Sequence, residues 1–182
     1  MLRTSQPVSA ADPSKPHLIL VGLPGSGKTT IGDLVARQLG RSFLDFDHEI
    51  SRREGMTVAQ IFATKGEHAF REMEQKLTRE LVQLGNMVLA PGGGWAADET
   101  NVLLLRPPAV MIYLKSTPVT ALKRMGSKGK TRPLLMRPNP LGELQQMLQN
   151  RVSAYSRADH VIDVERLTPQ QVSDKIVSLI GS

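Results

Sequence analysis

Residues 22–30 constrain this chain more than any other stretch, because they dictate backbone shape and ligand chemistry together. The run GLPGSGKTT fits the pattern G-x-x-x-x-G-K-[ST], and it stands between an apolar run at 18–21 and apolar residues at helical spacing from Ile31 to Leu39. Strand, glycine loop and helix in this order let successive backbone N–H groups turn toward phosphate oxygens. The pattern favours a nucleotide phosphate cradle over a plain glycine-rich turn, but it does not separate kinases from GTPases or motors.

The loop's side chains suggest how a triphosphate is held. Lys28 is suited to reach the β and γ phosphates as a point charge, and the Thr29 hydroxyl to ligate Mg²⁺. We therefore expect ATP with one Mg²⁺ ion here, and nucleotide contacts from Gly25, Ser26, Gly27, Lys28, Thr29 and Thr30.

Size and composition limit the remaining choices. A chain of 182 residues is the length of one α/β domain, and no apolar run approaches the roughly 20 residues of a membrane helix. There is no cysteine, so chemistry falls to carboxylates, basic groups and a metal ion. The net charge of +6 is compatible with nucleic acid, yet no run of five Lys or Arg occurs and aromatic residues are few. An anionic small-molecule substrate accounts better for arginines that stand singly.

The first residues of the chain are expected to be disordered, and the rest to be folded. Residues 1–16 carry no apolar core of a secretory signal and are predicted to be a disordered tail, although a short transit peptide is an alternative. Residues 17–182 are predicted to form one domain. We expect a cytoplasmic enzyme and a monomer, with no membrane or nucleic-acid partner.

Two carboxylates end the predicted second strand, at 42–47. Asp45 and Asp47 are two residues apart and would share one face of an extended chain. Carboxyl ends of parallel strands line the ligand crevice, so one aspartate can hold metal-bound water and the other can accept a hydrogen bond from a substrate hydroxyl. Alternatively, Asp47 is simply the N-cap of a following helix.

An arginine lies beside the buried stripe of the next long helix. The pattern T-x-x-Q at 57–60 opens a short helix that stops at Gly66, and apolar residues from Phe70 to Leu84 then follow a 3,4,4,3 spacing. Arg71 has Glu67 four residues before it and Glu74 three after. These residues form either a solvated salt-bridge ladder or an arginine oriented to grip a substrate carboxylate.

Three glycines follow the predicted third strand at 86–90. In phosphate-loop proteins this strand usually ends in the magnesium aspartate, but here it ends in Gly92, Gly93 and Gly94, which leaves Asp45 as the best metal carboxylate. Three glycines allow a ligand to approach bare backbone N–H groups, although a plain turn is the alternative.

Strands and helices alternate along the rest of the chain. Strands are predicted at 109–114 and 159–164, and helices at 118–125, at 141–157 and from 168 onward. This alternation predicts an α/β three-layer sandwich with a five-stranded parallel sheet.

Between the predicted helices at 118–125 and 141–157, the segment 126–133 has no apolar residue, two glycines and three positive charges. It is either a mobile lid, about 126–138, that brings Lys130 or Arg132 to the phosphates, or a solvated connector.

The motifs taken together resemble the shikimate kinase family from about residue 17 onward. The likeness is carried by 22–30, LDFD at 44–47, GEHAFREME at 66–74, GGG at 92–94, TRPLL at 131–135, and Arg151 with Tyr155. Membership implies a P-loop fold of the nucleoside-monophosphate-kinase type with a mobile lid. It also implies transfer of the γ-phosphoryl group of ATP to the 3-hydroxyl of shikimate, in the chorismate pathway of aromatic amino-acid synthesis.

The same resemblance implies roles by position. Thr29 and Asp45 resemble the magnesium site, Asp47 the group that binds and activates the accepting hydroxyl, and Lys28 the catalytic cation. Arg71 and Arg151 would hold the shikimate carboxylate, with Gly92, Gly93 and Gly94 near the ring hydroxyls. Arg132 resembles a catalytic lid arginine on the phosphates, and Arg124 one near the adenine. The nearest rival is another small-molecule or nucleoside-monophosphate kinase on the same fold, such as gluconate kinase, which shares the phosphate loop and lid.

Overall fold

The computed structural model describes residues 15–126 and 137–181. Its strands are β1 (Leu18–Val21), β2 (Ser42–Asp45), β3 (Met87–Ala90), β4 (Val110–Lys115) and β5 (His160–Asp163). Its helices are α1 (Lys28–Leu39), α2 (Phe46–Glu54), α3 (Val58–Leu81), the 3₁₀ turn η1 (Trp95–Ala97), α4 (Glu99–Leu105), α5 (Pro118–Gly126), α6 (Pro140–Tyr155) and α7 (Pro169–Ile180). Residues 1–14 of the expected tail, and residues 127–136 of the expected lid with Lys130 and Arg132, lie outside this description.

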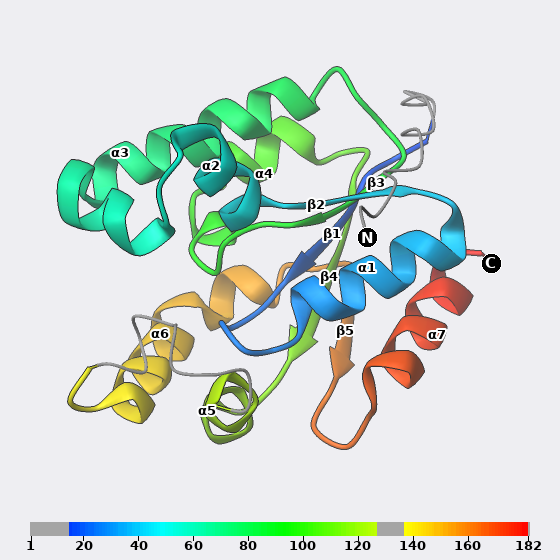
Figure 1. The fold of residues 1–182 in the computed structure, drawn as a ribbon. Coiled ribbons are helices and arrows are strands. Elements are labelled where there is room, and N and C mark those ends of the chain that lie inside the picture. The colour runs from blue at the N-terminus through cyan, green and yellow to red at the C-terminus, as the bar shows by residue number, and fades with distance from the viewer. Residues whose placement is uncertain (1–14, 127–136, 182) are drawn as a thin grey trace, which may run out of the picture.

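The five described strands form one parallel sheet in the order β2-β3-β1-β4-β5 (Figure 1). The strand that feeds the glycine loop is the central one, flanked by β3 and β4. Because all strands run the same way, the loops after β1, β2 and β3 emerge at one edge of the sheet. The predicted α/β fold with a five-stranded parallel sheet is confirmed.

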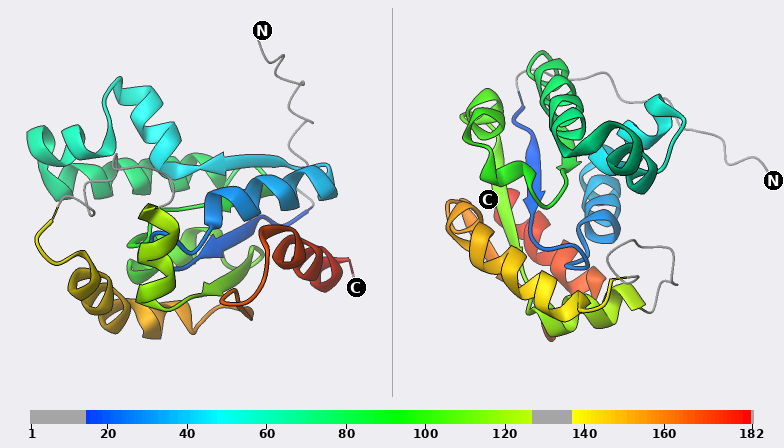
Figure 2. Two further views of the ribbon diagram at one scale, coloured as in Figure 1. Left: turned by 60° about the horizontal axis from the view of Figure 1, so that its bottom comes forward. Right: turned by 90° about the vertical axis from the view of Figure 1, so that its left-hand side faces the viewer.

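Helices cover both faces of the sheet, which Figure 2 shows from two further sides, and alternate residues of each central strand face opposite layers. One buried cluster joins Leu18, Leu20 and Ile112 to residues of α1 and α7. The other joins Ile19, Met111 and further odd-numbered strand residues to α2, α3, α4 and α6. The strands are apolar on both faces for this reason, as is typical of a parallel sheet covered on both sides.

Capping signals marked several helix starts correctly. Thr57 and Gln60 form a reciprocal capping box before α3, and Thr168 and Gln171 form another before α7. The helical run that follows Thr57 is broken at Gly66, where φ is 83°. A short helix and a long one therefore meet there, as predicted.

Three predictions about the elements were wrong. The second strand ends at Asp45 rather than at residue 47, because the Asp45 carboxylate accepts from the His48 N–H and caps a helix that begins at once with buried Phe46. Asp45 and Asp47 therefore do not share a strand face, and Asp45, not Asp47, is the cap.

Leu84 lies beyond the end of α3 and is 41% exposed, so it is not part of the buried stripe. The sequence analysis also missed η1 and α4.

A buried histidine ties the start of β1 to its neighbours. His17 Nε2 lies 3.0 Å from the Leu81 carbonyl at the end of α3, and His17 Nδ1 accepts from the Met87 N–H at 3.4 Å. A carbonyl can only accept, so Nε2 is the donor of the pair and Nδ1 the acceptor.

We expect His17→Leu to lower the free energy of unfolding by about 2 kcal/mol, because a side chain of similar size leaves both partners without their hydrogen bond. Urea denaturation measures this loss. His68→Leu, at a side chain that is 89% exposed, is the matched control and should change little. Equal stability of the two variants would contradict a structural role for His17.

Across the described ranges, no helix is both long enough and apolar enough to span a bilayer.

Candidate active site

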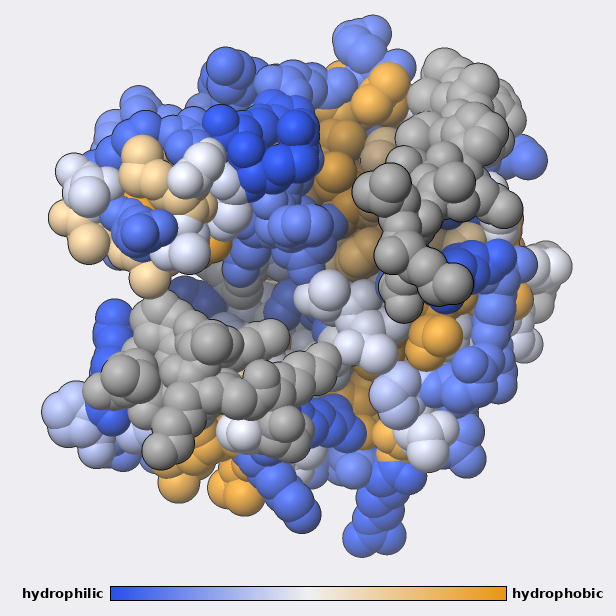
Figure 3. Space-filling model, viewed as in Figure 1, coloured by the Kyte–Doolittle hydropathy of each residue, from blue (hydrophilic) through white to orange (hydrophobic). Residues whose placement is uncertain are grey.

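A cleft of about 910 Å³ opens where β1, β2 and β3 end. Its lining comes from the glycine loop, from Asp45 and Asp47, from Gly92 and Gly93, and from Arg124. The space-filling view shows the surface hollowed beneath α2 and α3 (Figure 3). The cleft is large enough for two small ligands side by side, with the glycine loop at its floor.

The glycine loop has the backbone that its sequence predicts. Gly25 and Gly27 have φ of 86° and 101°, in the left-handed region where a side chain is strained. Lys28 opens α1, and its Nζ donates to the carbonyl oxygens of Gly22 at 2.8 Å and Leu23 at 3.0 Å. The lysine side chain thus curls back over the loop, and its charge lies where phosphate oxygens would approach.

The side-chain oxygens of Thr29 and Asp45 meet beside the glycine loop. The Thr29 hydroxyl donates to Asp45 Oδ2 at 2.6 Å, while Asp45 Oδ1 accepts from the His48 N–H at 3.2 Å. A hydroxyl and a carboxylate at the edge of a phosphate site are the hard oxygen donors that Mg²⁺ prefers, so these residues fit the predicted ion. Within the described ranges, no group of three or more His, Asp or Glu side chains is placed so that it could hold a metal ion.

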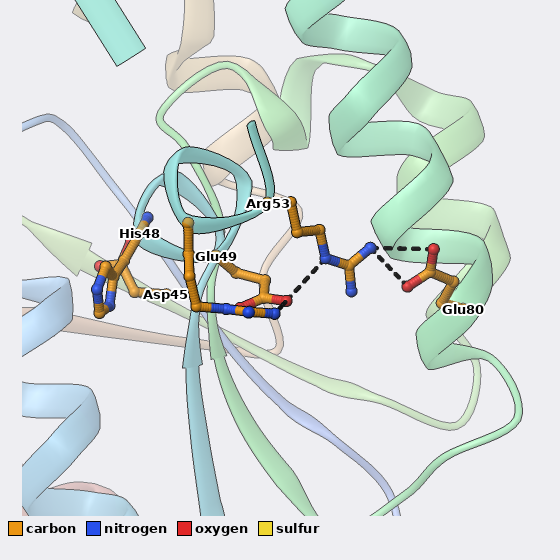
Figure 4. A network of polar contacts seen from close by, with 6 residues as sticks. Asp45, His48, Glu49, Arg53 and Glu80 are labelled. Atoms are coloured by element: carbon orange, nitrogen blue, oxygen red, sulfur yellow. Dashed lines mark hydrogen bonds and ion pairs between the residues drawn. The ribbon is translucent and has the colours of Figure 1, made fainter. Parts of the chain in front are cut away.

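Asp47 lies in the first turn of α2, and that helix is fastened to α3. Arg53 of α2 donates to Glu49 at 2.7 Å and to Glu80 of α3 at 3.0 Å, and Figure 4 shows it lying between the two carboxylates. Hydrogen bonds from Arg52 and Arg53 lower the pKa of Glu49 to about 2, so the Glu49 carboxylate stays ionised at neutral pH. Each exposed pair is individually weak, but together they restrict how α2 can shift.

The three glycines are each faced by a different site side chain. A Cβ atom on Gly92 would come within 2.6 Å of Glu74 Oε1 and 3.2 Å of Asp47 Oδ1. The same atom on Gly93 would lie 2.9 Å from Arg151 Nη1, and on Gly94 it would lie 2.8 Å from both terminal nitrogens of Arg71. A side chain at any of these positions would displace a charged group that now packs against bare backbone. The fold therefore brings together the residues that the sequence predicts to bind the substrate that accepts the phosphoryl group, namely Asp47, Arg71, Arg151 and Gly92–Gly94.

Arg71 is held by two carboxylates of its own helix. Its Nη1 donates to Glu74 at 2.6 Å and its Nη2 to Glu67 at 3.0 Å. Burial opposes the charge on Arg71, but the attraction and hydrogen bonds of Glu74 and Glu67 together outweigh burial and raise the pKa of Arg71. The guanidinium is therefore oriented and stays charged, although Glu67 is largely exposed and adds little.

Glu74 is a fully buried carboxyl group at this site. Burial raises the pKa of Glu74, the attraction of Arg71 opposes that shift, and the nearby charge of Asp47 adds to it. Its Oε1 has no hydrogen-bond partner in the part of the chain that the structure describes. Arg71 is thus the group that chiefly favours the ionised form of Glu74, against the burial that favours its protonated form.

Arg124 lies at the opposite end of the cleft. Its Nη2 donates to the Val164 carbonyl at 2.6 Å, and Leu167 and Pro169 line the same end. The sequence did not predict this apolar end of the cleft, although it lies in the loop before the capping box at Thr168.

The sequence also gave no role to Tyr155, whose hydroxyl donates to the Gly93 carbonyl at 2.6 Å and so fixes the glycine turn from α6. Arg132 lies outside the described residues.

Comparison with known proteins agrees with this geometry. The family model for shikimate kinase matches residues 24–181. A shikimate kinase of Thermodesulfovibrio yellowstonii is 35% identical over 161 residues, which are 88% of this chain and 92% of the relative. One of Nitrosomonas europaea is 41% identical over 146 residues, 80% of this chain and 69% of the relative. The solved shikimate kinase from Acinetobacter baumannii in complex with shikimate is 37% identical, with a TM-score of 0.85 over 92% of this chain and 93% of that one. The chain therefore belongs to the shikimate kinase family.

Proposed function

We propose that this protein transfers the γ-phosphoryl group of ATP to the 3-hydroxyl of shikimate, giving shikimate 3-phosphate and ADP. Family membership supports the reaction. The observation that carries the assignment of roles is the convergence of Asp47, Arg71 and Arg151 on the bare backbone of Gly92–Gly94, beside a phosphate loop. A small ring that carries both a carboxylate and hydroxyls matches this set of groups.

The acceptor is held by charge at one end and by hydrogen bonds at the other. Arg71 and Arg151 supply two guanidinium groups, which bind a carboxylate by parallel hydrogen bonds. Asp47 accepts from the reacting hydroxyl, and the backbone of Gly93 contacts the other ring hydroxyls. The acceptor therefore lies with one hydroxyl directed toward the glycine loop.

The nucleotide occupies the glycine loop and the Arg124 end of the cleft. Lys28 exchanges its hydrogen bonds to the Gly22 and Leu23 carbonyls for phosphate oxygens. Arg124 and the apolar residues near Val164 contact the adenine. Thr29 and Asp45 would hold Mg²⁺, which would neutralise part of the phosphate charge.

The transfer requires little covalent chemistry from the protein. The 3-oxygen forms a bond to the γ phosphorus as the bond from that phosphorus to ADP breaks, and Asp47 takes the hydroxyl proton. Lys28 stabilises charge on the phosphoryl oxygens, a role that we also propose for Arg132 from the sequence. Catalysis is therefore mainly a matter of orientation and charge.

Measuring ADP release with shikimate, gluconate and nucleoside monophosphates in parallel tests the proposal. Of the three kinds of acceptor, we expect only shikimate to give ADP release, and ³¹P NMR should identify the product as the 3-phosphate. Turnover with gluconate and none with shikimate would replace this proposal with the rival kinase activity.

The raised pKa of Glu74 predicts how acceptor binding responds to pH. Because the pKa of Glu74 lies above the ordinary value of 4.5, Glu74 takes up a proton over a higher pH range than ordinary carboxyls do. Arg71 then loses its closest anionic partner. We expect the KM for shikimate to rise as the pH falls through this range, measured by steady-state kinetics.

Glu74→Gln mimics the protonated form and isolates this effect. Its KM for shikimate should be raised about tenfold at neutral pH, equivalent to about 1.4 kcal/mol, and should lose the acid-side dependence. Because the pKa of Glu74 is raised in the folded state, its protonated form adds to the free energy of unfolding below pH 4.5, and this contribution is lost as the pH rises. Replacing the charged carboxylate with a neutral amide should therefore not lower the free energy of unfolding at neutral pH. Parallel pH profiles in the two enzymes would contradict this role.

A further inference from the structure

A single tryptophan follows the three glycines. Trp95 is the only tryptophan in the sequence, and its side chain is fully buried. Its backbone N–H donates to the Gly92 carbonyl at 3.0 Å, which closes the glycine turn. The residue that ends the turn therefore also sends a large side chain into the interior.

The indole is joined to α3 by a buried relay of hydrogen bonds. Trp95 Nε1 donates to Thr78 Oγ1 at 2.9 Å, and Thr78 Oγ1 donates to the Glu74 carbonyl at 2.7 Å. Thr78 is fully buried as well. Glu74 is the residue that holds Arg71, so the relay connects the glycine turn to the part of α3 that carries the arginine.

The indole ring also contacts the start of α2. Trp95 and Phe46 pack edge to face, with centroids 6.3 Å apart and planes at 75°. Phe46 is fully buried and lies between Asp45 and Asp47 in the chain. One side chain thus contacts all three elements that supply the acceptor site: the glycine turn, α2 and α3.

We propose that Trp95 is a positioning residue that sets the separation of Asp47 and Arg71 through its relay with Thr78. The inference rests on the proposed function, since those two groups are assigned to the two ends of one acceptor. A phenylalanine would also place an aromatic ring in the core, but only the directional N–H bond of an indole fixes the ring's distance from α3. Displacements well under the size of an atom matter for in-line transfer, so this distance affects turnover.

Steady-state kinetics of relay variants test the proposal. Thr78→Val keeps the shape but removes the hydroxyl, and we expect the KM for shikimate to rise about tenfold and kcat to fall several-fold, with the KM for ATP unchanged. Thr78→Ser restores the relay and should restore both constants. Trp95→Phe should match Thr78→Val, and the double variant should be no worse than either, because both remove the same bond.

Fluorescence gives an independent measurement. Shikimate titrated without nucleotide should change Trp95 emission saturably, and in Thr78→Val the midpoint should shift by the same factor as KM. Leu81→Val, in the buried face of the same helix but outside the relay, is the matched control and should lower stability only.

The outcomes separate the two levels of inference. Wild-type enzyme that does not turn over shikimate contradicts the proposed function. Wild-type turnover, together with Thr78→Val and Trp95→Phe variants that are less stable but kinetically normal, overturns only the role of Trp95.

Discussion

Replacing Asp47 with asparagine is expected to lower kcat by about 10²- to 10⁴-fold, the usual contribution of a general base. Asparagine has the same shape and can still accept a hydrogen bond, but it cannot take the proton of the attacking hydroxyl. Asp47 Oδ1 lies beside Gly92, among the groups assigned to the phosphoryl acceptor rather than to the nucleotide. Nucleotide affinity, measured calorimetrically with ADP and Mg²⁺, should therefore stay unchanged.

The matched control is Asp33→Asn on α1. Asp33 is partly exposed and pairs with Arg37 at 2.8 Å on the surface, so the same chemical change there should leave kcat unaltered. Turnover near the wild-type rate in Asp47→Asn would remove Asp47 from the chemistry and leave it a binding role at most.

The fold was predictable because its signals are local. Unbroken apolar runs predicted β1 and β4, and capping boxes at Thr57 and Thr168 marked two helix starts. The order of strands and helices then left few topologies open, since crossovers between parallel strands are right-handed.

The boundary at Asp45 was not predictable from local pattern. Residues 43, 44 and 46 are all apolar, so the run reads as a strand through residue 47. What ends the strand is tertiary: Phe46 is fully buried against Trp95, and that placement leaves the Asp45 carboxylate free to cap α2. The short turn η1 and helix α4 were missed because neither repeats an apolar period long enough to detect.

The site was predictable in its residue types but not in its contacts. Spacing alone left Arg71 undecided between a surface ladder and an acceptor ligand. Its flat approach to Gly94 depends on how α3 packs against the glycine turn, 20 or more residues along the chain. The relay from Trp95 to Thr78 spans 17 residues in the same way, so sequence periodicity could not reveal it.

Arg71→Ala is expected to raise the KM for shikimate by about 10- to 100-fold, with a smaller effect on kcat. The loss corresponds to charge-assisted hydrogen bonds of about 1.5 to 3 kcal/mol. Because the carboxylate is remote from the reacting hydroxyl, most of this energy is lost equally from ground state and transition state, and such a change appears in KM. Steady-state kinetics with shikimate varied at saturating ATP measure it.

Two further variants separate charge from geometry. Arg71→Lys keeps the charge but loses the planar fork, so its KM should lie between those of wild type and Arg71→Ala. Arg79→Ala, at an exposed arginine of the same helix that pairs with Gln75, should change nothing. If Arg71→Ala behaves like Arg79→Ala, then Arg71 belongs to the surface ladder with Glu67, and Arg151 alone would hold the carboxylate. If Arg71→Lys instead equals wild type, a simple positive charge is sufficient and the packing of the guanidinium against Gly94 has no part in binding.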